Sequence, residues 1–257
     1  MYLYINMEVI ILQRIFKYTD LDKIKPLFND IRFYMGKSVL DGVMGEAYVD
    51  NILSPNIAFL VVRSYCFISG KLNKEKLKCI IDENFNNYTL IPSDNLKKEI
   101  ENIYQNNIIK SQRYSIKKDV IFDKTKLKSM INNLTKDFRL VKITKELVDK
   151  IKKEEFICIT DDYENNGIGY CCMYNNEIIG VASSNIFYKD GIEVNIKVKD
   201  KYRRKGIASA MASSLILECL KKHKKISWDA YNMSSVFLAQ KLGFEFDSAY
   251  DIYELKN

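Results

Sequence analysis

The second half of the chain alternates between strand-like and helix-like hydrophobic patterns. Six segments have the alternating or continuous apolar pattern that is typical of strands. They are Phe138–Ile143, Gly167–Tyr174, Ile178–Tyr188, Ile192–Val198, Ile226–Tyr231 and Phe244–Leu255. Helical spacing predicts a helix over Thr144–Glu155, one that contains the apolar run Met211–Leu220 and ends at about Lys222, and one over Ser234–Leu242, where Gly243 ends it. The predicted order is one strand, a helix, three strands, a helix, a strand, a helix and a strand.

The first half has a less regular mixture of the same two patterns. Helices are expected over Asp20–Met35, Lys74–Asn84 and Ser93–Gln105, and strands over Glu46–Val49, Ile57–Ser69 and Ile108–Lys117. No Gly/Ser-rich linker separates the halves, so we place the boundary near Asn133–Asp137 from the pattern alone. The fold class is therefore α/β (α+β), with an N-terminal α/β domain over residues 1–136 and a second domain over residues 137–257.

A basic turn joins the strand ending at Val198 to the helix that follows. We call Arg203-Arg204-Lys205-Gly206-Ile207-Ala208 the basic turn. The first N–H groups of a helix are unpaired and its N-terminus is electropositive, so such a turn favours a bound anion such as a phosphate. Three cations at the positive end of a helix interact unfavourably with the helix dipole. A bound polyanionic ligand would offset this repulsion. The alternative is a solvated basic turn without a ligand.

The net charge of +7 does not by itself identify a partner. Lys and Arg are scattered along the 257 residues and interleaved with 33 acids, which is unlike a nucleic-acid-binding face. We therefore rank nucleic-acid binding last and expect the charge to attract a small anionic ligand.

The reactive residue types exclude several kinds of site. His223 is the single histidine, which removes most Ser-His-Asp and Cys-His schemes. The six cysteines form no C-x-x-C pair, so we expect no metal site, and adjacent Cys171 and Cys172 on a strand suggest reduced thiols. No apolar run approaches about 18 residues and no signal peptide is expected, so the prediction is a cytoplasmic protein without a membrane role.

Two motifs resemble those of the GNAT superfamily of N-acetyltransferases. Arg203, Gly206 and Ala208 fit its acetyl-coenzyme A signature, Arg/Gln-x-x-Gly-x-Gly/Ala. Its second motif is similar to Asn232, Ser235 and Leu242-Gly243-Phe244, in the expected order after one helix and one strand. The resemblance covers roughly residues 137–257, and a bacterial subgroup with an extra N-terminal domain looks closest. It implies a GNAT fold, with a mixed central sheet flanked by helices.

The resemblance also implies acetyl-coenzyme A as a co-substrate and a set of residues that bind it. Amides from Arg204 to Ala208, including Lys205, Gly206 and Ile207, would hold the pyrophosphate, and the basic side chains from Arg203 onward would add charge. A β-carbon at Gly206 would meet the phosphate oxygens. The Val198 amide would pair with the pantetheine and polarise the thioester carbonyl, while Asn232 and Ser235 would steady the pantetheine.

The expected activity is transfer of an acetyl group to a primary amine of a small molecule, such as a metabolite or an antibiotic. Protein or peptide acetylation and an acyl-coenzyme A sensor without catalysis remain alternatives. The superfamily often has a basic Glu on the fourth strand, which here is Glu193; a solvated Glu193, or a water chain from a residue such as Asp229, is the alternative. Ala239 occupies the position of the usual acid Tyr, so Tyr231, Tyr250 or Tyr253 would have to replace it. A homodimer is compatible with this interpretation.

Overall fold

The computed structural model describes residues 11–29, 34–117, 120–154, 156, 163 and 167–256. Its contacts divide the chain into two compact units: unit 1 comprises Met1–Gln112 and Asp251–Asn257, and unit 2 comprises Arg113–Tyr250. The expected boundary after residue 136 lies inside unit 2. The reason is helix α5 (Lys124–Asn132), which the hydrophobic pattern did not predict and which packs on helix α8 (Ile207–Lys221).

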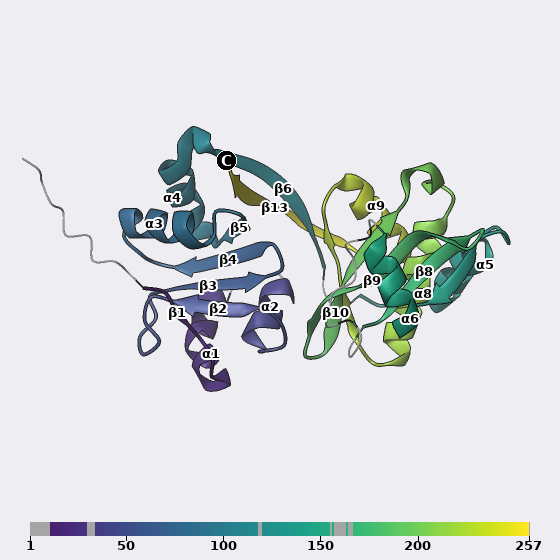
Figure 1. The fold of residues 1–257 in the computed structure, drawn as a ribbon, viewed down its shortest axis with the longest axis horizontal. Helices are drawn as coiled ribbons and strands as arrows, with labels where there is room; N and C mark the ends of the chain where they lie inside the picture. Colours follow the sequence, from purple (N-terminus) through teal and green to yellow (C-terminus); the bar gives the residue numbers. More distant parts are fainter. Residues whose placement is uncertain are drawn as a thin grey trace, which may run out of the picture. The chain divides into compact units, whose positions relative to one another are not determined.

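Unit 1 is built on a mixed sheet, antiparallel from β1 to β4 and parallel between β4 and β5, that is flanked by helices (Figure 1). Its strands are β1 (Gln13–Arg14), β2 (Glu46–Val49), β3 (Ile57–Val62), β4 (Tyr65–Gly70) and β5 (Thr89–Pro92). Its helices are α1 (Tyr18–Ile24), the 3₁₀ segment η1 (Lys25–Phe28), α2 (Tyr34–Leu40), α3 (Lys74–Asn84), α4 (Asp94–Tyr104) and the 3₁₀ segment η2 (Gln105–Asn107). Helices α3 and α4 each bury one apolar face, which contributes Leu77, Ile81, Leu96 and Ile100 to the core.

Two predicted elements of unit 1 are divided in the structure. The single strand expected over Ile57–Ser69 is an antiparallel hairpin, β3 and β4, because the chain reverses at Arg63 with φ +57°. The helix expected over Asp20–Met35 gives way to the 3₁₀ segment at Lys25, where Pro26 cannot donate an amide hydrogen bond. Residues 30–33 of that predicted helix lie outside the described residues. The predictions for β2 and α3 are confirmed with their exact bounds.

Two long strands have residues in both units. They are β6 (Ile108–Ile116) and β13 (Phe246–Leu255), and the unit boundary falls within each. The sheet that contains them has the order β1-β2-β3-β4-β5-β13-β6-β12, where β12 is Asp229–Ala230. In unit 2, Asp229 pairs with Ser115 and Ala230 pairs with Tyr114 of β6.

Unit 2 contains a second sheet, in the order β11-β10-β9-β8-β7 (Figure 1). Its strands are β7 (Arg139–Lys142), β8 (Gly169–Tyr174), β9 (Glu177–Tyr188), β10 (Gly191–Val198) and β11 (Lys225–Ser227). Neighbours are antiparallel except β10 and β11, which are parallel. Strands β8 and β9 form an antiparallel hairpin, with Asn175 and Asn176 at φ +48° and +63° in its turn. Such positive φ angles suit Asn better than most residues.

Helix α8 packs against β8, β9 and β10. Adjacent Cys171 and Cys172 on β8 point to opposite faces, yet both are fully buried, so both faces of that strand are covered. The remaining elements of unit 2 are helix α6 (Lys145–Lys153), the 3₁₀ segment η3 (Asp200–Tyr202) and helix α9 (Met233–Leu242). Thr144, the first residue of the predicted helix, is the N-cap residue of α6, whereas Glu155, the last one, lies outside the described residues.

The strand predicted over Ile226–Tyr231 changes its partner in the middle. Its first part, β11, pairs with β10 up to Ser227, and its second part, β12, pairs with β6 from Asp229 onward. The intervening Trp228 is buried and belongs to neither strand. The molecule is thus a mixed α/β protein whose sheets are flanked by helices. Among the helices of the described residues, none has both the length and the apolar surface that crossing a bilayer requires.

Substitution of Leu127 tests the packing of α5 on α8. Leu127 is fully buried on α5, so Leu127→Ala should reduce the free energy of unfolding by about 2–5 kcal/mol. The neighbouring Lys128 is exposed, and Lys128→Ala is the matched control, with an expected change within about 0.5 kcal/mol. Urea unfolding measures both. Equal midpoints for the Leu127→Ala variant and the wild type would contradict the placement of α5 in the core of unit 2.

Candidate functional site

The central feature of unit 2 is a divergence of two parallel strands. Strand β11 pairs with β10 at Gly191, Ile192 and Glu193 and then leaves it, while β10 continues to Val198 beside β9. A register shift in the β9–β10 pairing lies between Glu193 and Val194. The extra residue is Asn185 of β9, because Glu193 opposes Ile186 and Val194 opposes Ser184. This bulge lies on the strand next to Glu193.

The end of β10 presents backbone groups to the side from which β11 has left. The Lys199 amide donates to the Ile179 carbonyl of β9 at 2.9 Å. Because N–H groups alternate in direction along an antiparallel strand, the amides of Ile196 and Val198 point away from β9. The predicted Val198 amide is therefore directed toward the gap that opens as β11 diverges.

The basic turn leads into the N-terminus of α8. Gly206 is the N-cap residue at φ +79°, and no side chain caps the helix among the described residues. A β-carbon built on Gly206 meets no atom of the described residues within 4 Å, so the turn is open on that side. The first-turn amides of α8 and this open space are what an anionic group needs. The left-handed φ is a second reason for glycine, which the sequence motif alone did not reveal.

The cationic side chains of the basic turn are exposed. Arg203 forms an ion pair with Asp200 at 2.8 Å, in which both side chains are more than half exposed, so the pair contributes little to stability. The Lys205 ammonium lies 5.8 Å from the centre of the Tyr202 ring. Arg204 has a left-handed φ of +62° and an exposed side chain. These three cations are accessible to a ligand at the N-terminus of α8.

Glu193, the base that the family resemblance implies, is not on an open face. Its side chain is buried, and one carboxyl oxygen accepts from the Asp229 amide at 2.6 Å. The other oxygen lies within hydrogen-bond distance of the Ser227 hydroxyl. Burial, with a smaller contribution from the nearby Asp229 carboxylate, raises the pKa of Glu193 to about 8. Glu193 therefore connects β10 to both β11 and β12 at the divergence.

Asp229 is the second buried carboxylate of this region. Its Oδ2 accepts from Arg113 Nε at 2.7 Å and from the Tyr250 hydroxyl at 2.9 Å. Arg113 also donates to the Asp229 carbonyl at 3.2 Å, and its guanidinium lies 5.7 Å from the centre of the Tyr231 ring. The sequence analysis missed Arg113, because it precedes Asp229 by 116 residues and no local motif marks it.

The side chains of Asn232 and Ser235 are used within the protein. Asn232 caps α9 by accepting from the Ser235 amide at 3.0 Å, and the Ser235 hydroxyl accepts from Trp228 Nε1 at 3.0 Å. Trp228 is buried against Phe244, so it is a core residue. Both predicted pantetheine contacts lie at the N-terminus of α9 and also define where that helix begins.

The tyrosines that could replace the missing acid are not equivalent. Ala239 lies on the buried face of α9 and offers no hydroxyl. The Tyr253 hydroxyl belongs to unit 1 and donates to Glu101 at 2.8 Å. Tyr250 contacts Asp229, and Tyr231 is 71% exposed, so these two remain candidates in unit 2.

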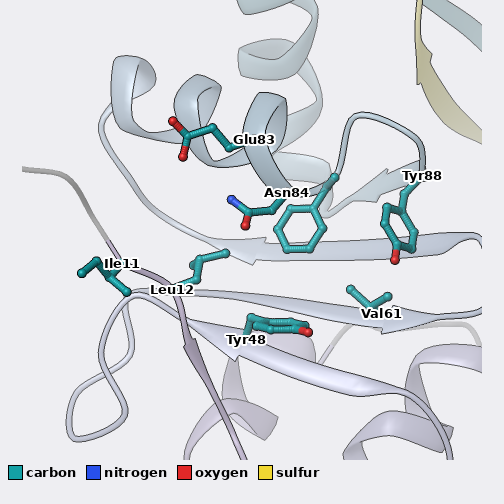
Figure 2. A pocket seen from close by; sticks show the side chains of 8 residues that line it. Ile11, Leu12, Tyr48, Val61, Glu83, Asn84 and Tyr88 are labelled. Atoms are coloured by element: carbon teal, nitrogen blue, oxygen red, sulfur yellow. The ribbon is translucent and has the colours of Figure 1, made fainter.

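A pocket of about 350 Å³ lies in unit 1, away in sequence from every predicted site residue (Figure 2). Its lining consists of Ile11, Leu12, Tyr48, Val61, Glu83, Asn84, Phe85 and Tyr88. In Figure 2 the Glu83 carboxylate points away from the aromatic rings. The lining thus mixes apolar side chains with the polar groups of Tyr48, Glu83, Asn84 and Tyr88, and it includes none of the predicted site residues.

The raised pKa of Glu193 predicts a pH-dependent stability. The folded protein holds this proton up to pH about 8, whereas the unfolded chain loses it near 4.5, so stability falls as pH rises between these values. The slope is about 1.4 kcal/mol per pH unit for one proton. The Glu193→Gln variant should lack this component, which urea unfolding at pH 5, 6, 7 and 8 would detect. If the free energy of unfolding changed with pH in the same way for the variant and the wild type, the pKa of Glu193 would not be raised in the folded protein.

Comparisons with known proteins agree with this fold. The GNAT acetyltransferase family model matches residues 25–253, which extends far beyond residues 137–257 where the sequence resemblance was found. The uncharacterized N-acetyltransferase YdfB of Bacillus subtilis (strain 168) is 29% identical over 102 residues. That match spans only 39% of YdfB and 39% of this chain.

Solved structures match over nearly the whole chain. A GCN5-related N-acetyltransferase-like protein from Streptococcus suis 89/1591 has a TM-score of 0.83 and 30% identity, covering 93% of this chain and 99% of its own. A tandem GNAT protein from the clavulanic acid biosynthesis pathway has a TM-score of 0.55, covering 95% and 98%. At 8% identity, the second similarity concerns the fold alone. Because the family model covers nearly all of the sequence and the structural match includes both units, the chain belongs to the GNAT acetyltransferase family.

Proposed function

We propose that the protein is an N-acetyltransferase that moves an acetyl group from acetyl-coenzyme A to a primary amine of a small molecule. The observation that carries the proposal is the divergence of β10 from β11 at Glu193, followed by the uncapped N-terminus of α8. The open edge of β10 would pair with the extended pantetheine arm of coenzyme A. The N-terminus of α8, with its free amides and the cations of the basic turn, would bind the pyrophosphate.

The residues present fit coenzyme A in three places. The amides from Arg204 to Ala208 would hold the pyrophosphate, with the open space at Gly206 and the exposed cations of the basic turn beside it. The Val198 amide, directed away from β9, would pair with the pantetheine and polarise the thioester carbonyl. Asn232 and Ser235 would contact the pantetheine from the start of α9.

The reaction needs a group that takes a proton from the acceptor. An alkylammonium with a pKa near 10.4 is deprotonated in only about one molecule in a few thousand at pH 7. The amine attacks the thioester carbonyl, the C–N bond forms, the C–S bond breaks, and the departing thiolate takes the second N–H proton. Because a thiol has a pKa near 8.5, the missing Tyr at Ala239 costs less than a missing base would. Two buried carboxyls, those of Glu193 and Asp229, lie at the divergence and are the candidates for this role.

Binding of acetyl-coenzyme A tests the basic turn. Gly206→Ala adds a methyl group in the predicted phosphate site and should weaken binding by at least about tenfold, or 1.4 kcal/mol, in isothermal titration calorimetry. Gly243→Ala is the matched control, because Gly243 also has a left-handed φ, +109°, and ends α9. Both variants should lose about 1–2 kcal/mol of stability from backbone strain. No binding by the wild type, or equal loss in both variants, would refute the proposed site.

An acceptor screen separates this function from its alternatives. Thiol release from acetyl-coenzyme A would be followed with a polyamine, an aminoglycoside and a lysine-containing peptide. Turnover with either of the first two supports the small-molecule function, and turnover with the peptide alone supports protein acetylation. Binding of acetyl-coenzyme A without turnover on any amine would favour an acyl-coenzyme A sensor, for which the alanine at position 239 is the motivating observation.

A further inference from the structure

Three charged side chains are buried together where β10, β12 and β6 meet. Arg113, Glu193 and Asp229 are all about nine-tenths buried, with exposures of 9% for Arg113, 6% for Glu193 and 7% for the Asp229 side chain. Two carboxylates and one guanidinium would leave a net negative charge enclosed in the protein, which is strongly unfavourable. One proton on the carboxyl pair makes the group neutral.

The hydrogen bonds at Ser227 indicate which carboxyl holds that proton. The Ser227 hydroxyl has one proton but two acceptor neighbours, the Ile192 carbonyl at 3.2 Å and a carboxyl oxygen of Glu193. Both contacts are satisfied if Ser227 donates to Ile192 and a protonated Glu193 donates to Ser227. The other Glu193 oxygen still accepts from the Asp229 amide. Burial acts in the same direction by raising the pKa of Glu193.

Asp229 differs from Glu193 in having a direct ion-pair partner, Arg113. Burial is the largest influence and leaves the pKa of Asp229 raised, while Arg113 opposes this rise by its charge and its hydrogen bond, and the Tyr250 hydroxyl donates to the same oxygen. The second oxygen, Oδ1, is buried and has no hydrogen-bond partner within the described part of the chain. An unpaired buried carboxylate oxygen is unusual and calls for a donor.

We propose that Asp229 accepts the proton of the amine substrate through Oδ1, and that Glu193 is a protonated positioning residue. This inference rests on the proposed function, and it assigns to Asp229 the role that the family resemblance gave to Glu193. Asp229 lies two residues after Ser227, where β11 has just left β10, so it belongs to the divergence that receives the thioester. Oδ1 is enclosed in the free protein, so substrate binding must move the atoms that cover it.

The proton transfer is balanced within this arrangement. The acceptor ammonium donates one N–H proton to Oδ1, directly or through one water molecule, and becomes a neutral amine. Asp229 becomes neutral and later releases the proton to solvent. Arg113 stabilises Asp229 while it is ionised, and Tyr250 from β13 keeps its Oδ2 occupied, so that Oδ1 is the oxygen available to a donor. Glu193 fixes the Asp229 backbone through its amide and stays protonated throughout.

The charged groups facing Asp229 set the expected pH dependence. They are Arg113 from β6, Tyr250 from β13 and Glu193 from β10. Ionisation of Glu193 above pH about 8 adds a second negative charge beside Asp229. Transfer by Asp229 should therefore persist at pH 6–7, whereas transfer by Glu193 would require its ionised form and would rise toward pH 8.

A first experiment measures the ionisation of the folded wild type directly. With ¹³C-labelled Glu and Asp, the Glu193 carboxyl should titrate with a midpoint near 8. The proposal requires Asp229 to be ionised at pH 7, because Arg113 and Tyr250 both donate to its Oδ2. The Glu193→Gln and Asp229→Asn variants assign the two signals. Propylammonium chloride is the probe of the acceptor position and should shift the Asp229 signal more than that of Glu193. An ionised Glu193 with a protonated Asp229 at pH 7 would overturn the proposal.

A second experiment compares variants in acetyl transfer to the best amine of the acceptor screen. Gln reproduces the hydrogen bonds of a protonated Glu, so Glu193→Gln should keep kcat/KM within about threefold of the wild type at pH 7. Asp229→Asn should lower it by about 10²–10⁴-fold, the usual contribution of a general base. Asp247→Asn, the same substitution at an exposed position of unit 2, is the control and should be unchanged.

The outcomes separate this inference from the proposed function. Loss of transfer in Glu193→Gln with normal transfer in Asp229→Asn would overturn the inference but leave the acetyltransferase function intact. If the wild type binds no acetyl-coenzyme A, the proposed function fails, while the ¹³C titration still decides which carboxyl holds the proton. If Asp229→Asn does not fold, the titration of the wild type and the Glu193→Gln rates still decide the assignment.

Discussion

The carboxyl group of Glu193 connects three backbone segments at the point on which the site depends. It bonds the Ser227 hydroxyl at the end of β11 and the Asp229 amide at the start of β12, while its own residue lies on β10. Strands β10 and β11 pair up to this position and separate beyond it. A side chain that joins both strands by hydrogen bonds stabilises the last paired position and so defines where the divergence begins.

The divergence has consequences for the backbone on either side of it. On one side, β10 continues along β9 and presents alternate amides, including that of Val198, to the gap. On the other side, β12 pairs with β6, which places Asp229 beside Arg113. A parallel strand pair that stayed together would have used these amides in the sheet itself. Binding groups thus become available because regular pairing stops.

Charge balance links this geometry to chemistry. Burial of two carboxyls with one guanidinium requires a shared proton, because an uncompensated charge in a protein interior is costly. The hydrogen bonds of Ser227 and Arg113 distinguish the two carboxyls and assign them different protonation states. Exposed cations at the basic turn serve a different purpose, because a solvated Arg or Lys can meet a phosphate without a prior structural partner.

The sequence by itself indicated most elements of unit 2 and the basic turn, because hydrophobic periodicity and the two motifs are local signals. It named Glu193 as the candidate base, with Asp229 as an alternative, and Gly206 as part of the predicted phosphate site. It could not determine that Trp228 separates β11 from β12, that α5 belongs with unit 2, or that Arg113 reaches Asp229. Those features depend on pairing and burial between segments far apart in the chain, and only the tertiary structure brings such segments together.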